Sequence, residues 1–300
     1  MEKRILGKTG LSVSILGFGG AEIGYRVPTM SEKTVEKILM EALETGLNTI
    51  DTAECYNKSE ELIGSALGKR RSAVHIFTKC GHGKNYMDDA WEPSDLQASI
   101  DRSLKRLRTD YIDLLQLHSC SQDILARGEV IEVLQKARKS GKTRFIGYSG
   151  DSKDALYAIN CGAFDTLQTS INIADQEALQ LTLPLALEKN MGVIVKRPIA
   201  NAAFSYKSKP DFDYAVPYWE RLQKLKYDFI NGDTRHTAAV ALRFTLSVPG
   251  VHTAIVGTSK SGRYTENAKV LAEGLLSKSD FEAIRKHWHN VATPQWVGQT

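Results

Sequence analysis

Short apolar runs alternate with longer helical patterns along almost the whole chain. Such alternation is typical of βα units whose strands form a parallel sheet. The runs expected to be strands lie at 15–20, 47–50, 74–78, 111–117, 145–148, 166–167, 193–195 and 253–256. Helices are expected at 31–44, 59–67, 93–107, 122–139, 154–159, 176–189 and 234–246, with further helical patterns to residue 288. The aromatic stretch 201–218 is expected to be an irregular loop.

About eight such units favour a closed barrel over an open doubly wound sheet. An open sheet that binds a dinucleotide needs GxGxxG after its first strand, and residues 17–22 carry Glu22 at the third glycine position. Ahead of the repeats, residues 4–6 and 11–14 flank Gly7-Lys8-Thr9-Gly10, which predicts a β-hairpin. The sequence therefore predicts an α/β fold, a (β/α)8 TIM barrel with an N-terminal β-hairpin and extra helices and loops. Such barrels run to ~250 residues, so we expect one domain, residues 1–300.

Charge and composition argue against several classes of protein. A net charge of +4 is only mildly basic, so no nucleic-acid partner is expected. There is no run of ~18 apolar residues and no signal-peptide pattern at the N-terminus, so we expect no membrane association and a cytoplasmic location. The four cysteines form no CxxC pair and are expected to stay reduced. No heptad pattern points to an oligomeric state.

Polar side chains end three successive predicted strands, at Asp51, Lys79 and His118. Active sites of barrels form at the carboxyl ends of the strands, and neighbouring strands lie ~4.8 Å apart. These side chains are therefore expected to share one pocket with Tyr56, which lies in the loop after Asp51. Asp51 would hold Lys79 as a cation, and a nearby ammonium favours ionisation of a tyrosine. The cluster suits protonation of a developing oxyanion as hydride arrives from a cofactor.

Other chemistries fit parts of the same cluster. Asp51 and Lys79 could form a purely structural ion pair. Lys79 could form a Schiff base, as in aldolases, although Asp51 argues against this by stabilising its charge. Asp51 and His118 could bind a metal. No HExxH pattern is present, however, and His287 and His289 lie near the C-terminus, so no metal is expected.

Three segments resemble the aldo-keto reductase family. Segment 46–60, which holds Asp51 and Tyr56, resembles the family signature. Thr78-Lys79 resembles the family's lysine strand, and segment 110–118 resembles its histidine strand. The resemblance runs from the N-terminal hairpin to residue 267. It implies that Asp51, Tyr56, Lys79 and His118 are catalytic. It also implies that the protein reduces aldehyde or ketone groups to alcohols by hydride transfer from NADPH, with the tyrosine as general acid.

The same resemblance implies an NADP(H) site. Segment 146–149 resembles the strand whose serine holds the nicotinamide carboxamide, with Gln168 as its partner. Segment 255–260 resembles the clamp for the adenosine phosphate, where Lys260 and Arg263 favour NADP(H) over NAD(H). The residues implied to bind the cofactor are Gly20, Ala21, Asp51, Ser149, Gln168, Lys196, Arg197, Pro198, Ile199, Gly257, Thr258, Ser259, Lys260, Arg263, Glu266 and Asn267.

The chain departs from the family pattern at several cofactor positions. Gly150 stands where many members have asparagine, Lys196 replaces an aromatic ring, and Gly257 replaces a basic residue. These departures bear on cofactor geometry and preference more than on the chemistry. An alternative function remains open, since a fold does not fix a function. The protein could be an NADPH-binding sensor or regulatory subunit with little turnover, like the potassium-channel beta subunits of this fold.

Two features near the predicted pocket have no assigned role. Cys55, Cys80 and Cys120 each lie within two residues of a predicted catalytic residue. They could be redox-sensitive groups or small buried thiols. The loop at 81–91 follows Lys79 and is expected to edge the substrate pocket. Its candidate substrate contacts are His82, Tyr86 and Trp91. The carbonyl substrate itself is not identified by the sequence.

Overall fold

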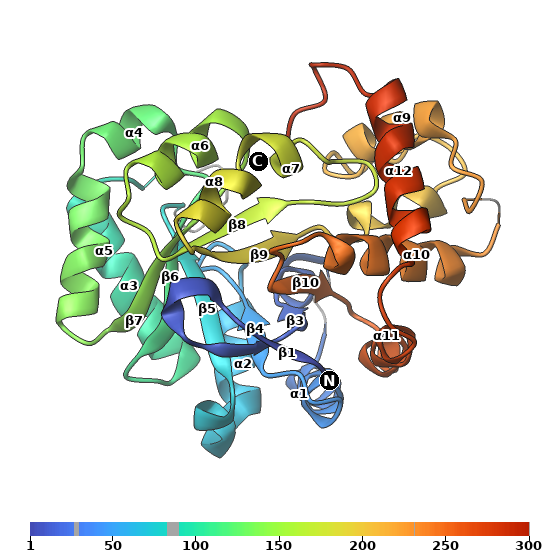
Figure 1. Cartoon of the computed structure of the whole chain (residues 1–300). Coiled ribbons are helices and arrows are strands. Elements are labelled where there is room, and N and C mark those ends of the chain that lie inside the picture. The colour runs from blue at the N-terminus through green and yellow to red at the C-terminus, as the bar shows by residue number, and fades with distance from the viewer. Residues whose placement is uncertain (27–29, 83–89, 231, 300) are drawn as a thin grey trace.

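The computed structural model describes residues 1–26, 30–82, 90–230 and 232–299. Within these ranges, eight parallel strands close into a barrel in the order β10-β3-β4-β5-β6-β7-β8-β9 (Figure 1). The strands are β3 Leu16–Gly19, β4 Thr49–Asp51, β5 His75–Cys80, β6 Ile112–His118, β7 Thr143–Ser149, β8 Thr166–Ser170, β9 Gly192–Lys196 and β10 Thr253–Gly257. The predicted TIM barrel is confirmed, and each predicted strand lies at or next to an observed one.

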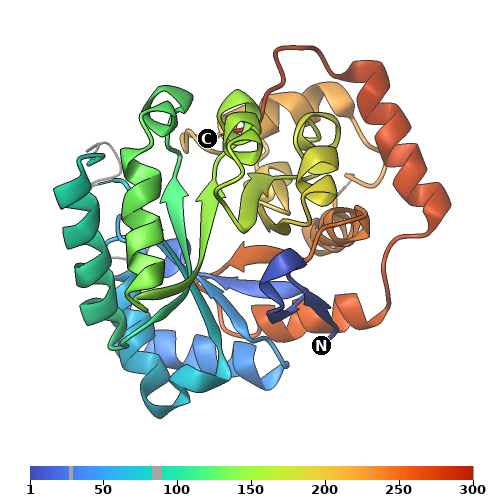
Figure 2. The same ribbon diagram turned by 60° about the vertical axis from the view of Figure 1, so that its left-hand side comes forward.

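Helices connect the strands and surround the barrel (Figure 2). Those that match the predicted ranges closely are α1 Glu32–Glu44, α2 Ser59–Leu67, α3 Pro93–Leu107, α6 Ser152–Asn160 and α10 Thr234–Ser247. Helix α1 begins after its N-cap Ser31, whose hydroxyl accepts a hydrogen bond from the Thr34 N–H. Its buried residues recur at i, i+3, i+4 and i+7, so one apolar face packs on the barrel; they are Val35, Ile38, Leu39 and Ala42.

The N-terminal hairpin closes one end of the barrel. Its strands β1 Lys3–Ile5 and β2 Ser12–Ser14 pair antiparallel, with a single turn, η1 Gly7–Thr9, between them. The Lys8 N–H donates to the carbonyl oxygen of Asn190 (2.7 Å), just ahead of β9. The hairpin side chains share one buried cluster with side chains of β5, β6, β9 and β10: Leu6, Leu11, Val13, Phe77, Leu114, Ile194 and Ile255. This apolar plug fills the amino-terminal end and leaves the carboxyl ends of the strands for the site.

Two helices expected to be continuous are broken. The segment predicted as one helix at 122–139 forms α4 Gln122–Ala126 and α5 Glu129–Lys139. Gly128 separates them at φ 82°, a left-handed conformation that ends a helix. The segment predicted at 176–189 forms α7 Ala178–Leu181 and α8 Leu183–Glu188. Pro184 lacks an N–H donor, so the helical hydrogen-bond pattern restarts there.

The segment 201–218 is more ordered than expected. It begins in η4 Ala200–Ser205 and ends inside a helix that the sequence reading missed, α9 Val216–Leu225. Helix α9 has Pro217 in its first turn and buries Tyr218, Leu222 and Leu225. The remaining elements are η2 Glu22–Arg26, η3 Gly68–Ala73, α11 Arg263–Ala272 and α12 Lys278–Val291. Among the described residues, no helix is both long and apolar enough to cross a membrane.

The C-terminal segment returns from α12 to the barrel mouth, ending near α7 (Figure 1). Arg221 donates to the carbonyl oxygen of Val297 (2.7 Å), and the Gly298 N–H donates to Glu177 (2.7 Å). A Cβ atom on Gly298 would lie 2.6 Å from Asp151 Cβ, so only glycine fits this close approach. Residues 297–299 therefore form part of the wall above β7 and β8.

Candidate active site

A buried ion pair lies at the carboxyl ends of β4 and β5. Lys79 Nζ donates to Asp51 Oδ1 (2.6 Å) and to the carbonyl oxygen of Thr52 (2.8 Å). Asp51 and Lys79 are only 5% and 2% exposed. Charges this deeply buried are tolerated when each has a partner and further hydrogen bonds. The contacts therefore hold the ammonium at a fixed place beneath the barrel mouth.

Tyr56 and His118 face this pair. The Lys79 ammonium lies 5.2 Å from the centroid of the Tyr56 ring. The Tyr56 and His118 rings meet edge to face, with centroids 5.7 Å apart. The structure thus brings together all four residues that the sequence placed in one cluster.

Glu54 anchors the loop that carries Tyr56. Its carboxylate accepts hydrogen bonds from Ser99 and from Arg102 Nε (2.5 Å), both on α3. Its N–H donates to the carbonyl oxygen of Lys79 (3.2 Å). Glu54 was not predicted from the sequence. A glutamate in a loop is usually exposed, and its partners on α3 are known only from the structure. The loop is therefore fixed to both β5 and α3.

His118 is neutral near pH 7. Burial first, and then the neighbouring Lys79 ammonium, hold its pKa well below the ordinary value of 6.5. Its ring lies edge to face with that of His82 (5.1 Å), which in turn contacts Trp91 (5.8 Å). Two of the three candidate substrate contacts, His82 and Trp91, thus lie beside the catalytic cluster, while Tyr86 lies outside the described residues. A neutral imidazole can donate one hydrogen bond to a substrate carbonyl.

A second chain of contacts links the ion pair to β7 and β8. Ser149 Oγ donates to Gln168 Oε1 (2.8 Å), and Gln168 Nε2 donates to Asp51 Oδ2 (2.9 Å). Ser149 and Gln168 are each 1% exposed. A hydroxyl and a primary amide side by side offer both donors and acceptors, which suits a carboxamide group.

Lys196 and Arg197 at the end of β9 share a buried acid, Asp151. The Lys196 Nζ lies 2.7 Å and the Arg197 Nη1 4.0 Å from Asp151 Oδ2. Burial lowers the pKa of Lys196 to about 8, although Asp151 acts in the opposite direction. Burial acts to raise the pKa of Asp151, but the two cations hold it below its usual range. Both cations also donate to the carbonyl oxygen of Gln299. The two side chains can therefore donate together to a single oxygen atom.

Asp151 was missed by the sequence reading. It also accepts hydrogen bonds from Thr169 Oγ1 and the Ser170 N–H, each at 2.7 Å. Its partners lie on β8 and at the end of β9, and nothing in the local sequence of Asp151 points to them.

The other predicted cofactor residues lie after neighbouring strands. β10 pairs with both β9 and β3, so their carboxyl ends adjoin. Arg263 Nη1 donates to Glu266 (2.7 Å) within the first turn of α11. A Cβ atom on Gly257 would lie 2.7 Å from Glu22 Cγ, which explains a glycine there. The predicted residues that end or follow these strands, or lie in the first turns of α11, are Gly20, Ala21, Pro198, Ile199, Gly257, Thr258, Ser259, Lys260, Arg263, Glu266 and Asn267.

This set of donors fits a nicotinamide dinucleotide. Ser149 and Gln168 match a carboxamide, and Lys196 and Arg197 match an anionic phosphate. At the far end, the Ser261 hydroxyl and the Gly262 N–H ahead of α11 donate to the carboxylate of Glu41 (2.9 and 2.7 Å), and Lys260 and Arg263 flank this helix start, a place that favours an anionic group.

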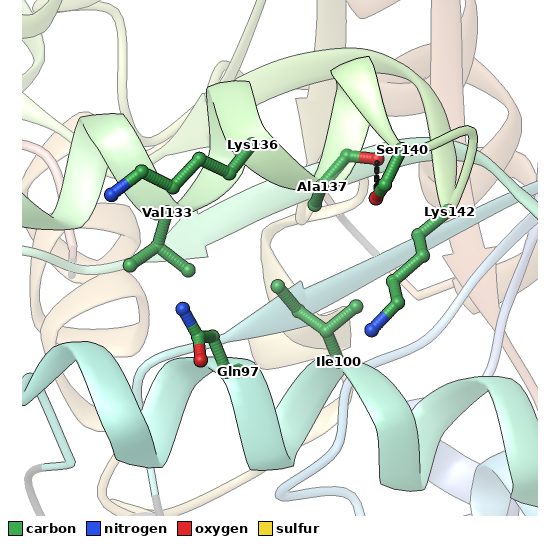
Figure 3. A pocket seen from close by; sticks show the side chains of 7 residues that line it. All are labelled: Gln97, Ile100, Val133, Lys136, Ala137, Ser140 and Lys142. Atoms are coloured by element: carbon green, nitrogen blue, oxygen red, sulfur yellow. Dashed lines mark hydrogen bonds between the residues drawn. The ribbon is translucent and has the colours of Figure 1, made fainter.

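A cavity between α3 and α5 is a separate feature (Figure 3). It has a volume of about 240 Å³, and side chains of the two helices face each other across it. It is lined by Gln97, Ile100, Val133, Lys136, Ala137, Ser140 and Lys142. None of the candidate site residues lines this cavity, which is separate from the cluster at the carboxyl ends of the strands.

Comparison with known proteins identifies the family. The model of the aldo/keto reductase family matches residues 15–289. The chain belongs to this family. It is 30% identical to L-galactose dehydrogenase from Arabidopsis thaliana, an alignment that covers 100% of this chain and 99% of that protein. It is also 30% identical to the NADH-specific methylglyoxal reductase of Escherichia coli, over 75% of this chain and 74% of that protein.

A solved aldo/keto reductase has the same fold. The holo form of the aldo-keto reductase AKR11C1 from Bacillus halodurans superposes with a TM-score of 0.82 at 28% sequence identity. The match covers 98% of this chain and 99% of that one. The protein is thus an oxidoreductase of the aldo/keto reductase family that reduces carbonyl groups to alcohols.

Proposed function

We propose that this aldo/keto reductase uses NADPH and that Tyr56 is the general acid that protonates the carbonyl oxygen. The observation that carries this proposal is the buried Lys79–Asp51 pair beneath the Tyr56 ring. A fixed ammonium stabilises the phenolate that remains after the proton leaves.

Each residue of the cluster has a distinct task in this scheme. Asp51 fixes the Lys79 ammonium, and Lys79 stabilises the negative charge left on Tyr56. His118, neutral and buried, donates a hydrogen bond that orients the substrate carbonyl and stabilises the developing oxyanion. A bound reduced nicotinamide supplies the hydride. Glu54 ties the loop that carries Tyr56 to α3 and to the Lys79 backbone.

The cofactor is assigned to the carboxyl ends of β7 to β10 and β3. Ser149 and Gln168 would hold the nicotinamide carboxamide, and Lys196 and Arg197 the pyrophosphate. Lys260 and Arg263 would pair with the 2′-phosphate that distinguishes NADPH from NADH. We also propose that residues 1–300 form one domain that works in the cytoplasm, where the thiols of its four cysteines stay reduced.

Removing the two cations at α11 is expected to change coenzyme choice. The double variant Lys260→Ala, Arg263→Ala should bind NADPH about tenfold more weakly and NADH about as well as before, because charge-assisted bonds to the 2′-phosphate are lost. Fluorescence titration gives both dissociation constants. Lys269→Ala removes an exposed cation from the same helix and is the matched control. Equal weakening for both coenzymes would refute the assignment.

Coenzyme binding should depend on the charge of Lys196. Its pKa of about 8 means that the ammonium is lost as pH rises through this value, so the attraction for pyrophosphate falls. Between pH 7 and pH 9 the dissociation constant should rise about tenfold, since each pH unit above the pKa removes a factor of ten in charged lysine. Lys196→Arg stays charged over this range and should flatten the profile. A flat wild-type profile would contradict the prediction.

The function is tested with a panel of aldehydes, ketones and aldoses, by following the loss of reduced nicotinamide with NADPH or NADH. Turnover of at least one carbonyl class is expected, with NADPH preferred. Tight NADPH binding without turnover of any substrate would contradict the proposed catalytic role of Tyr56.

A further inference from the structure

The thiol of Cys55 touches the candidate catalytic histidine. Its Sγ lies 3.5 Å from Nδ1 of His118, within hydrogen-bond distance for sulfur. Cys55 is 2% exposed and His118 6% exposed, so the contact is shielded from solvent. The ring nitrogen on the other side of the imidazole is Nε2.

The backbone just ahead of Cys55 is held in place. Lys79 Nζ donates to the carbonyl oxygen of Thr52 (2.8 Å), and the Glu54 N–H donates to the Lys79 carbonyl oxygen (3.2 Å). Glu54 is itself bonded to Arg102 on α3. The position of the Cys55 thiol is therefore set by the barrel and not by a free loop.

A neutral imidazole has two tautomers that differ in what they offer a substrate. One nitrogen carries the hydrogen and donates, while the other accepts. Burial and Lys79 keep His118 neutral near pH 7, so one of the two tautomers must be chosen. A thiol is a weak donor and a weak acceptor, whereas an unprotonated imidazole nitrogen is a good acceptor. The favoured bond at this contact therefore runs from the Cys55 S–H to Nδ1, with the imidazole hydrogen on Nε2.

We propose that Cys55 is a positioning residue that holds His118 in the Nε2–H tautomer, so that Nε2 donates to the carbonyl oxygen of the substrate. This inference rests on the role proposed above for His118. The opposite tautomer would present a lone pair to the carbonyl oxygen, which repels it and gives no stabilisation as charge develops. Cys55 thus acts through the histidine and does not touch the reacting atoms.

The test compares Cys55→Ala with Cys55→Ser. The alanine variant removes the donor, and kcat is expected to fall about fivefold, the factor that a single modest hydrogen bond supplies. The dissociation constant for NADPH should not change. The serine variant keeps a hydroxyl donor and should recover most of the lost kcat. Cys80→Ala is the matched control: it deletes an equally buried thiol, 1% exposed, that contacts the carbonyl oxygen of Gln116 instead.

The tautomer is read directly, without coenzyme or substrate, from the nitrogen-15 shifts of the His118 ring. The wild type and Cys55→Ser should show hydrogen on Nε2, and Cys55→Ala a mixture of both tautomers. An unchanged Nε2–H tautomer in Cys55→Ala, or an unchanged kcat, would overturn the inference. If the wild type reduced no carbonyl, or if His118→Ala kept its kcat, the proposed function would fail instead, while the tautomer spectrum would still report on Cys55.

Discussion

Methionine in place of Lys79 is expected to lower kcat by about a hundredfold or more and the free energy of unfolding by about 3 kcal/mol. In the proposed scheme the activity falls because the variant lacks the ammonium that would stabilise the Tyr56 phenolate. The stability falls because Asp51, only 5% exposed, keeps a buried charge with Gln168 as its remaining side-chain hydrogen-bond partner. Denaturant unfolding and steady-state kinetics measure the two effects.

A double variant separates the effect on activity from the effect on stability. Replacing both partners of a buried ion pair with apolar residues is often close to neutral for stability. The double variant Asp51→Leu, Lys79→Met should therefore regain most of the lost stability and none of the activity. A single Lys79→Met variant as stable as the wild type would show that the pair is not buried as described.

Tyr56→Phe is expected to reduce kcat by about a hundredfold or more, the usual contribution of a general acid. The substitution removes only the hydroxyl, so the ring keeps its edge-to-face contact with His118 and its place beside Lys79. Coenzyme affinity and the unfolding transition should match those of the wild type. A variant that retains its kcat would remove Tyr56 from the proton-transfer step, whatever its effect on KM.

Much of the barrel could be predicted because the spacing of apolar residues and the repeated alternation of strand and helix patterns can be seen in the sequence. Helix α2 lies at Ser59–Leu67 and α3 at Pro93–Leu107, the ranges that the apolar spacing and Pro93 predicted. The break at Gly128 was not predicted, because a glycine inside a helical sequence pattern is often tolerated without a break, and its left-handed conformation is known only from the structure. Helix α9 was missed because aromatic residues and prolines dominate the stretch before it.

The candidate cluster could be predicted because three of its residues lie at strand ends and Tyr56 lies in the loop after one of them. Asp51, Lys79 and His118 each end a strand, so the barrel topology brings them together. Asp151 and Glu54 act through partners on other elements, and the Cys55–His118 contact joins the loop after β4 to the end of β6. Such contacts depend on where side chains point in the folded protein, and the spacing of residues along the chain does not determine this.

The most direct test of the account is the fate of the hydride. The wild-type protein would be incubated with the best carbonyl substrate of the panel and with NADPH that carries deuterium at the transferable ring position, and the alcohol analysed by mass spectrometry and NMR. The account predicts a single deuterium on the former carbonyl carbon, formed at a rate that Tyr56→Phe lowers about a hundredfold. An alcohol without deuterium, or labelled product formed equally fast by Tyr56→Phe, would contradict it.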